Sequence, residues 1–110
     1  MSNVISALLK RPGEIPRHVN VSNSLEALQK NVEGYFETIS FYALEKDFLI
    51  ICNEEGLIKD MPYNCTIYDQ PFVGPILIVG RKGTEFADLP VDWKTMKKLF
   101  PNLWEVPHGD

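Results

Sequence analysis

The residues whose types could do chemistry gather in one stretch of the sequence, from Asn53 to Asn64. An apolar run stops at its start, and two adjacent glutamates follow at once. Carboxylates at the end of a strand could hold a cation or transfer protons, but pairs of this kind in turns are usually solvated and inert. Both interpretations remain open on the sequence alone. The candidates for binding a ligand or a partner are Asn53, Glu54, Glu55, Tyr63 and Asn64.

Other catalytic motifs are missing from the sequence. Gly80 and Gly83 lack the spacing of a phosphate-binding loop, and no serine has the flanking glycines of a nucleophile elbow. A serine or cysteine nucleophile would need a histidine base, and His18 falls inside an expected hairpin where we expect it to be exposed. The spacing of the two cysteines and two histidines matches no zinc pattern. We therefore predict no catalytic residue, no metal site and no cofactor, and we favour a non-enzymatic protein over an enzyme.

Length, composition and charge describe one folded domain. The chain has 110 residues, of which 45% are hydrophobic and 24% charged, so we expect a single domain over residues 1–110 with frayed ends at 1–3 and 107–110. A net charge of -4 repels phosphates, so nucleic acid is not an expected partner. No basic segment leads into an apolar one and no run approaches the ~20 apolar residues of a membrane span. We expect a reducing cytoplasm in which Cys52 and Cys65 stay unbridged.

Apolar runs and turn residues predict the strands. The run 48–52 is too short for a good helix and β-branched at its centre, which indicates a strand buried on both faces. The aromatic-rich segment 35–44 alternates and should form a hairpin with it across the polar turn 45–47. The other expected strands are 4–9 and 17–21, joined at Pro12-Gly13, and then 65–68 and 72–79.

Two helices complete the predicted fold. The first should begin at Asn23 and stop at Gly34. The side chain of Glu26 should bond back to the amide of Asn23, as in a capping box. The second should begin at Asp92 and be limited by Pro101. The fold class is therefore α+β: a single domain with a mixed, mostly antiparallel sheet of about 4–6 strands and two helices.

The same pattern predicts a core and a role for the central loop. We expect Gly56 to adopt a positive φ, and Leu57 and Ile58 to pin the loop to the core. Asn53 and Asn64 should bond loop amides and carbonyls that no strand pairing reaches, which would leave the glutamates facing solvent. The residues expected to be buried together are Leu28, Val32, Ile39, Leu49, Ile51, Ile76, Ile78 and Met96.

Large aromatic side chains are numerous for so small a domain. Core packing should take most of them, and any left exposed together would form a protein-binding patch. The leading hypothesis is therefore a non-enzymatic interaction protein, with a homodimer as one possible form. The alternative is a small-ligand-binding or hydrolytic protein that uses the carboxylates near Asn53–Glu55. The aromatic residues concerned are Tyr35, Tyr42, Tyr63, Tyr68, Trp93 and Trp104.

Several segments together resemble an uncharacterised domain family, known as domain of unknown function 3846. The strongest likeness lies in 52–59, which is followed by Met61-Pro62-Tyr63-Asn64. The turn at Pro12-Gly13, the segment 23–29, Gly34-Tyr35 with Glu37, and Ile78-Val79-Gly80 complete the set. Members often carry a basic residue where this chain has Cys65. The resemblance implies no activity. It implies an origin in bacteriophages or bacterial mobile elements, a bacterial cytoplasm, and a host or element-encoded protein as partner.

Overall fold

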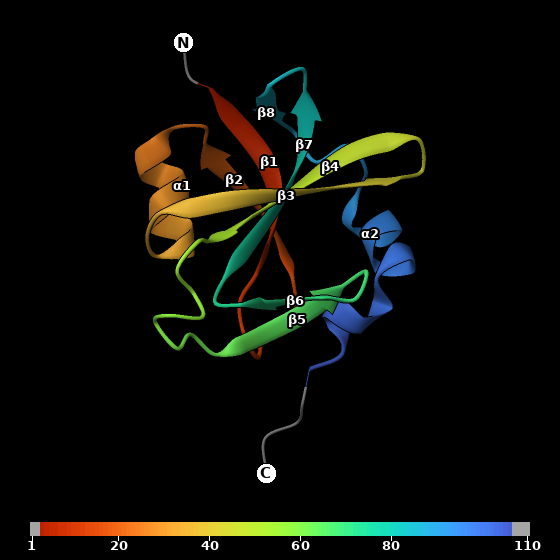
Figure 1. Ribbon diagram of the computed structural model, residues 1–110. Helices are drawn as coiled ribbons and strands as arrows, with labels where there is room; N and C mark the ends of the chain where they lie inside the picture. Colours follow the sequence, from red (N-terminus) through yellow and green to blue (C-terminus); the bar gives the residue numbers. More distant parts are fainter. Residues whose placement is uncertain (1–2, 107–110) are drawn as a thin grey trace.

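The protein is an α+β domain built on one antiparallel sheet. The structure, a computed structural model, describes residues 3–106. Of the frayed ends expected at 1–3 and 107–110, residues 1–2 and 107–110 lie outside the described residues, and the carbonyl of Asn3 accepts from the amide of Asn23 at 2.7 Å. Figure 1 shows the elements in chain order: β1 (Val4–Lys10), β2 (Arg17–Ser22), α1 (Leu25–Val32), β3 (Phe36–Ala43), β4 (Lys46–Asn53), β5 (Tyr63–Ile67), β6 (Gln70–Val73), β7 (Ile76–Lys82), β8 (Glu85–Ala87), α2 (Trp93–Leu99) and the 3-10 helix η1 (Pro101–Trp104).

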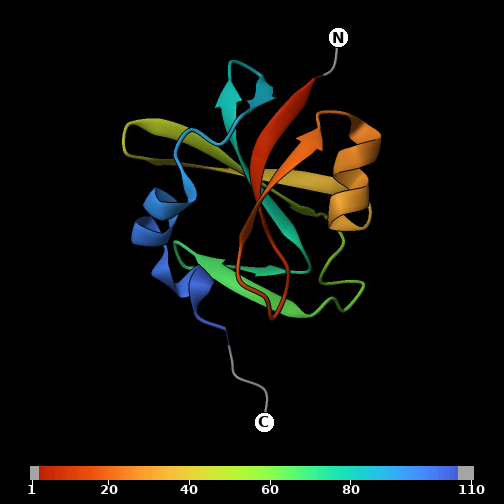
Figure 2. The ribbon, with the colours of Figure 1, turned by 180° about the vertical axis from the view of Figure 1, so that it is seen from behind.

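The main sheet has six strands in the order β2-β1-β7-β4-β3, with β8 paired to β7, and β5 and β6 form a separate two-stranded sheet. Every pairing within residues 3–106 is antiparallel. This confirms the predicted fold class. The β1–β2 hairpin and the β3–β4 hairpin lie on opposite sides of the molecule (Figures 1 and 2).

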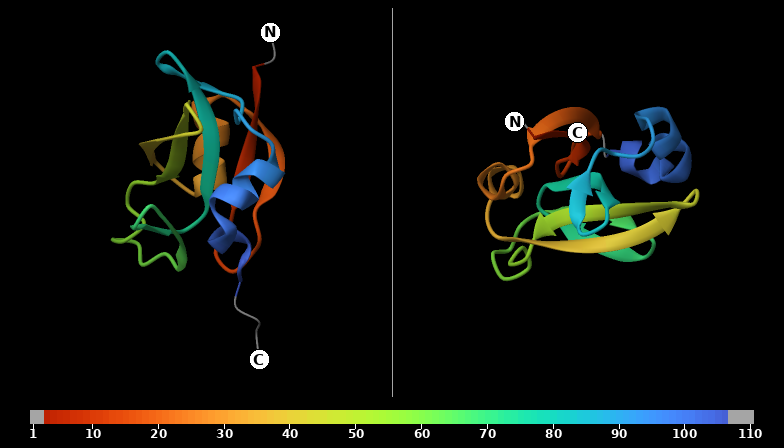
Figure 3. Two further views of the ribbon diagram at one scale, coloured as in Figure 1. Left: turned by 90° about the vertical axis from the view of Figure 1, so that its right-hand side faces the viewer. Right: turned by 90° about the horizontal axis from the view of Figure 1, so that it is seen from above.

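The core is divided into two clusters by the sheet. Successive side chains of a strand point to opposite faces, so Leu49 and Ile51 pack with α1 while Ile50 packs on the other face with Ile78 and the second helix. The helices α1 and α2 lie at opposite sides of the sheet (Figure 3).

The prediction of a single shared core was therefore wrong in one respect. Leu28, Val32, Leu49 and Ile51 belong to the α1 side, while Ile76, Ile78 and Met96 belong to the other. Ile39 is only half-buried. The strand 48–52 is buried along its whole length, as predicted.

Two boundaries differ from prediction for local reasons, and one strand was missed. The β3–β4 turn uses Leu44 and Glu45, whose φ values of 53° and 60° are the backbone of a tight two-residue hairpin; β4 thus starts at Lys46. The predicted strand 72–79 is two strands, because Gly74 has a φ of 72° and Pro75 cannot donate to a ladder. The strand β8 was not predicted.

The helix caps also shift by one residue. Ser24, not Asn23, caps α1, since its hydroxyl accepts from the amide of Ala27 at 3.2 Å. Glu33 takes the left-handed conformation at the other end with a φ of 65°, one residue before the expected Gly34. In α2, Asp92 is the cap as predicted and accepts from the amide of Thr95 at 2.8 Å.

Candidate functional site

The loop from β4 to β5, residues 53–64, begins at a fully bonded asparagine. The side chain of Asn53 is buried. Its Nδ2 donates to the carbonyls of Val32 at 3.0 Å and Glu33 at 3.2 Å, and its Oδ1 accepts from the amide of Glu55 at 2.8 Å. These bonds tie the end of α1 to the end of β4, which confirms the predicted structural role.

The two glutamates of the loop do not form a carboxylate site. Glu54 is exposed, and Glu55 pairs with Lys59 four residues on, at 3.6 Å, with both side chains nearly half exposed. An ion pair this exposed contributes little to stability. Within residues 3–106, no three His, Cys, Asp or Glu side chains come together to hold a metal ion.

The middle of the loop differs from prediction. Leu57 and Ile58 are 83% and 84% exposed and pin nothing to the core. Gly56 does not have a positive φ; Asp60 does, at 56°. The requirement at Gly56 is space, because a Cβ there would lie 2.7 Å from Cγ2 of Val73.

A groove of about 290 Å³, here called the loop groove, runs beside this exposed pair. Its lining combines Leu57 and Ile58 with Ile39 from β3 and with β6. The remaining lining residues are Glu37, Cys52, Asn53, Glu54, Gly56, Gln70, Pro71, Phe72 and Val73.

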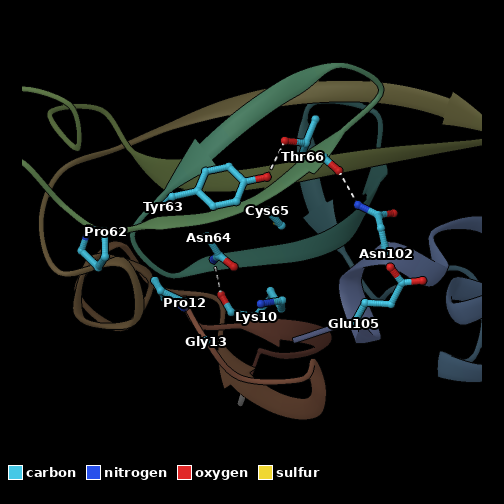
Figure 4. A pocket seen from close by; sticks show the side chains of 10 residues that line it. All are labelled: Lys10, Pro12, Gly13, Pro62, Tyr63, Asn64, Cys65, Thr66, Asn102 and Glu105. Carbon is cyan, nitrogen blue, oxygen red and sulfur yellow. Dashed lines mark hydrogen bonds between the residues drawn. The ribbon is translucent and has the colours of Figure 1, made fainter. Parts of the chain in front are cut away.

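A larger hollow of about 580 Å³ lies at the other end of the loop and is called the Lys10 pocket (Figure 4). It is formed where the end of β1, the β1–β2 turn, the start of β5 and η1 meet. Its lining residues are Lys10, Pro12, Gly13, Pro62, Tyr63, Asn64, Cys65, Thr66, Asn102 and Glu105.

The most unusual residue of the Lys10 pocket is the lysine itself, which is 2% exposed. Its Nζ donates to the carbonyl of Arg11 at 3.0 Å. Among residues 3–106 no carboxylate lies within ion-pair distance of it. Burial lowers the pKa of Lys10, and the charges of Cys65 and Glu14 oppose that shift in part. The buried ammonium is thus left without a counter-ion from the described chain.

Asn64 forms the floor beside Lys10 and is also buried. Its Nδ2 donates to the carbonyls of Lys10 and Gly74, each at 2.7 Å, which joins three distant segments. Its Oδ1 is buried without a hydrogen-bond partner. Figure 4 shows the side chain pointing toward Lys10. A buried polar atom left in this state is uncommon and calls for an explanation.

The rest of the pocket wall is held by hydrogen bonds. The hydroxyls of Tyr63 and Thr66 lie 2.6 Å apart, and Nδ2 of Asn102 donates to the carbonyl of Thr66 at 2.8 Å. Burial raises the pKa of the Cys65 thiol to about 11, although nearby Lys10 acts to lower it. The thiol is therefore neutral at pH 7 and a weak nucleophile.

The second cysteine is in a similar state. Burial, and next the charge of Glu37, raise the pKa of Cys52 to about 11. Both thiols are free, as predicted. His18 is exposed, also as predicted, and lines a different hollow, near Trp93.

The five predicted site residues thus separate. Asn53 and Glu54 border the loop groove, Tyr63 and Asn64 line the Lys10 pocket, and Glu55 lines neither. Sequence reasoning missed Lys10, although it directly follows the apolar run 4–9 and so continues a buried strand.

The expectation that core packing takes most of the large aromatic residues was wrong. All four tyrosines are 60–65% exposed, and Trp93 is 47% exposed. They lie on different elements, and Tyr68 makes edge contacts with Phe41 and Phe100. None of the described helices is long and apolar enough to cross a membrane.

Comparison with known proteins gives a family and nothing finer. A search of the curated proteins found no match, and neither did a search of the solved structures. A scan of protein families matches residues 5–101 to one described as a domain of unknown function, DUF3846. This match covers most of the chain, including both ends of the loop and Lys10. The chain therefore belongs to the DUF3846 family.

Proposed function

We propose that this is a small non-enzymatic interaction protein of a bacteriophage or bacterial mobile element, active in the bacterial cytoplasm, and that it binds by adding a strand to the edge of β3. The observation that carries the proposal is this edge: β3 pairs with β4 on one side and is the last strand of the sheet on the other. An extended segment that pairs there would continue the sheet, which is a common mode of recognition.

The hydrogen-bond pattern shows which backbone groups are free to pair. The amide of Glu54 donates to the carbonyl of Tyr35 at 3.0 Å, so that facing pair is hydrogen-bonded. In an antiparallel ladder bonded and non-bonded pairs alternate. The backbone groups that face away from β4 are therefore those of Phe36, Thr38, Ser40 and Tyr42.

The edge lacks the devices that usually protect an outer strand. Over its eight residues β3 carries one charged side chain, Glu37, and no lysine or proline, and its pairing with β4 runs without a register shift. Long, regular edges of this kind are templates for further strands. Exposed apolar side chains flank the edge at Tyr42 and Leu44.

The edge is also complementary to itself, so we assign a second copy of the chain as its occupant. Two antiparallel β3 strands centred on Ile39 would use all four free residues and would place no like charges opposite each other. Such a two-fold contact is the commonest form of symmetric dimer. The facing pairs would be Ile39 with Ile39, Thr38 with Ser40, Phe36 with Tyr42, and Glu37 with Phe41.

Sedimentation velocity over a wide range of concentration tests this proposal. The variant Ser40→Pro removes one outward amide and leaves the β4 pairing in place, so we expect wild type to dimerise and this variant to stay monomeric. The matched control is Asn20→Pro on the other edge. Its facing residue, Ser6, uses its amide and carbonyl for Asp88 and Leu89, so the Asn20 amide also faces outward.

The control should dimerise like wild type. A wild type that stays monomeric throughout, or a Ser40→Pro variant that dimerises as well as wild type, would overturn the assignment of a second copy to this edge. A partner protein from the host or the mobile element would then be the remaining occupant for this edge.

A further inference from the structure

The Lys10 pocket holds two buried polar groups whose bonding the described chain leaves incomplete. A lysine ammonium has three N–H donors, and that of Lys10 has one acceptor, the carbonyl of Arg11. Burying a charge without a partner is costly. In the same pocket, Asn64 donates to the backbone carbonyl of Lys10, and its Oδ1 is an acceptor with no donor. The unmet groups thus call for an anion and a hydrogen-bond donor.

We propose that the Lys10 pocket binds a small organic molecule that carries one anionic oxygen group, a carboxylate or a phosphate, and at least one N–H or O–H donor. The anionic oxygens would accept from Lys10. Because Oδ1 of Asn64 is covered in the structure, the donor would reach it once the Lys10 side chain turns toward the bound anion. The pocket volume of about 580 Å³ lies in the range of small-ligand sites. No residue of β3 lines it, so it is independent of the strand-addition edge.

The pocket walls restrict the rest of the ligand. Glu105 lies on the η1 side, and its carboxylate would repel a second anionic group but accept from a donor. Pro12, Pro62 and the ring of Tyr63 form the less polar wall. The arrangement favours a monoanion with an apolar part over a polyphosphate or a nucleic acid chain.

Backbone amide shifts in ¹H–¹⁵N NMR spectra test the proposal, with sodium acetate, sodium glycolate and inorganic phosphate as probes at constant ionic strength. Glycolate is acetate with an added O–H donor. We expect saturable shifts at the amides of Lys10, Arg11 and Gly13 and of residues 63–66, with dissociation constants of about 1–10 mM for such small probes. Glycolate should bind about threefold more tightly than acetate, as one hydrogen bond allows. Phosphate binding alone would assign a phosphate ligand, and carboxylate binding alone a carboxylate.

The variant Lys10→Met keeps the unbranched shape of the side chain but removes its terminal ammonium. It should weaken binding at least about tenfold, as expected for loss of a charge-assisted bond. Lys97→Met, at an exposed position of α2, is the control and should bind like wild type. Absence of saturable shifts beyond those caused by chloride, or equal binding by Lys10→Met, would overturn the proposal.

A second measurement does not depend on the variant's folding. The pKa of Lys10, followed in wild type by NMR of its side-chain methylene next to Nζ, should rise when the bound probe is present, because a nearby anion favours the charged amine. A pKa that does not move at saturating probe would also overturn the proposal.

Discussion

Asn53 and Asn64 stand at the two ends of one loop, are buried to a similar degree, and differ in whether their hydrogen bonds are complete. Asn53 uses both donors and its acceptor within a few residues of α1 and the loop. Asn64 uses its donors to hold two carbonyls but leaves its acceptor unpartnered in the Lys10 pocket.

The difference teaches how to separate a structural residue from a binding residue of the same type. A buried amide whose bonds are all made holds the fold and has nothing left for a ligand. A buried amide with an unmet acceptor still stabilises the fold through its donors, but it also retains a group that a ligand can satisfy. The four predictions below test this contrast, from the largest expected effect to the smallest.

Removing the two asparagine side chains should have unequal effects on the free energy of unfolding. Asn53→Ala leaves two carbonyls and one amide without partners, so we expect a loss of about 3 kcal/mol. Asn64→Ala leaves two carbonyls unpaired but also removes a buried, unsatisfied oxygen, so the net loss should be about 1 kcal/mol. Urea unfolding of both variants beside wild type measures the difference. Equal losses, or a larger loss for Asn64→Ala, would contradict the contrast.

The Asn53 end should also be the more tightly packed. Gly56→Val places a side chain against Val73, whose Cγ2 lies 2.7 Å from the position of a Cβ, and we expect destabilisation of about 1–3 kcal/mol from overpacking. The control Ile58→Val lies two residues on and is exposed, so it should change stability by less than about 0.5 kcal/mol. Thermal melts of both variants beside wild type measure the two changes in stability. A silent Gly56→Val would mean that the loop shifts to make room.

Lys10→Met should stabilise the fold at neutral pH, and the gain should shrink as the pH rises. The pKa of Lys10 is lowered in the folded state from 10.5. Between the lowered value and 10.5 the unfolded chain binds more protons, so wild-type stability rises with pH in that window. The variant lacks the Lys10 amine, so its stability does not rise with pH in this way.

Subtracting the two pH curves isolates this effect. Both proteins retain Cys52, whose pKa is raised from 9.0 to about 11, so its contribution to stability falls with rising pH in both and cancels. Lys10 acts to lower the pKa of Cys65, so its removal makes the stability of the variant fall more steeply at high pH, which also shrinks the gain. Urea unfolding from neutral pH to 10.5 gives the curves. A difference that stays constant with pH would show that Lys10 is not the source.

The sequence was sufficient to predict most strands, but not to predict which face of the sheet each side chain of a strand occupies. The run 48–52 is apolar without a break, so it predicts full burial, which the structure confirms. For the same reason it carries no period that would assign Leu49 and Ile50 to different sides. That assignment needs the pairing with β7 and the positions of both helices, which depend on contacts far apart in the sequence.

The candidate site was harder to predict because no local pattern joins its parts. Asn64 was selected from the loop, but its partner Lys10 lies 54 positions away. Hydrophobicity suggested that Leu57 and Ile58 were buried, whereas the close contact of Gly56 with Val73 fills the space beneath the loop. Hydrophobic type alone does not reveal which side of a loop is already occupied.

Neutralising the two loop carboxylates should have the smallest effect of all. Glu54 is exposed, and Glu55 makes one half-exposed ion pair with Lys59, so we expect Glu54→Gln with Glu55→Gln to change stability by less than about 0.5 kcal/mol. In a domain of this size that is a shift of roughly 3 °C or less in melting temperature. The bond from the Glu55 amide to Asn53 involves only backbone on the glutamate side and survives the change. A thermal melt of the double variant measures the shift. Loss of the fold, or of any binding activity found for the protein, would make the Asn53 end a functional site and would reverse the contrast with Asn64.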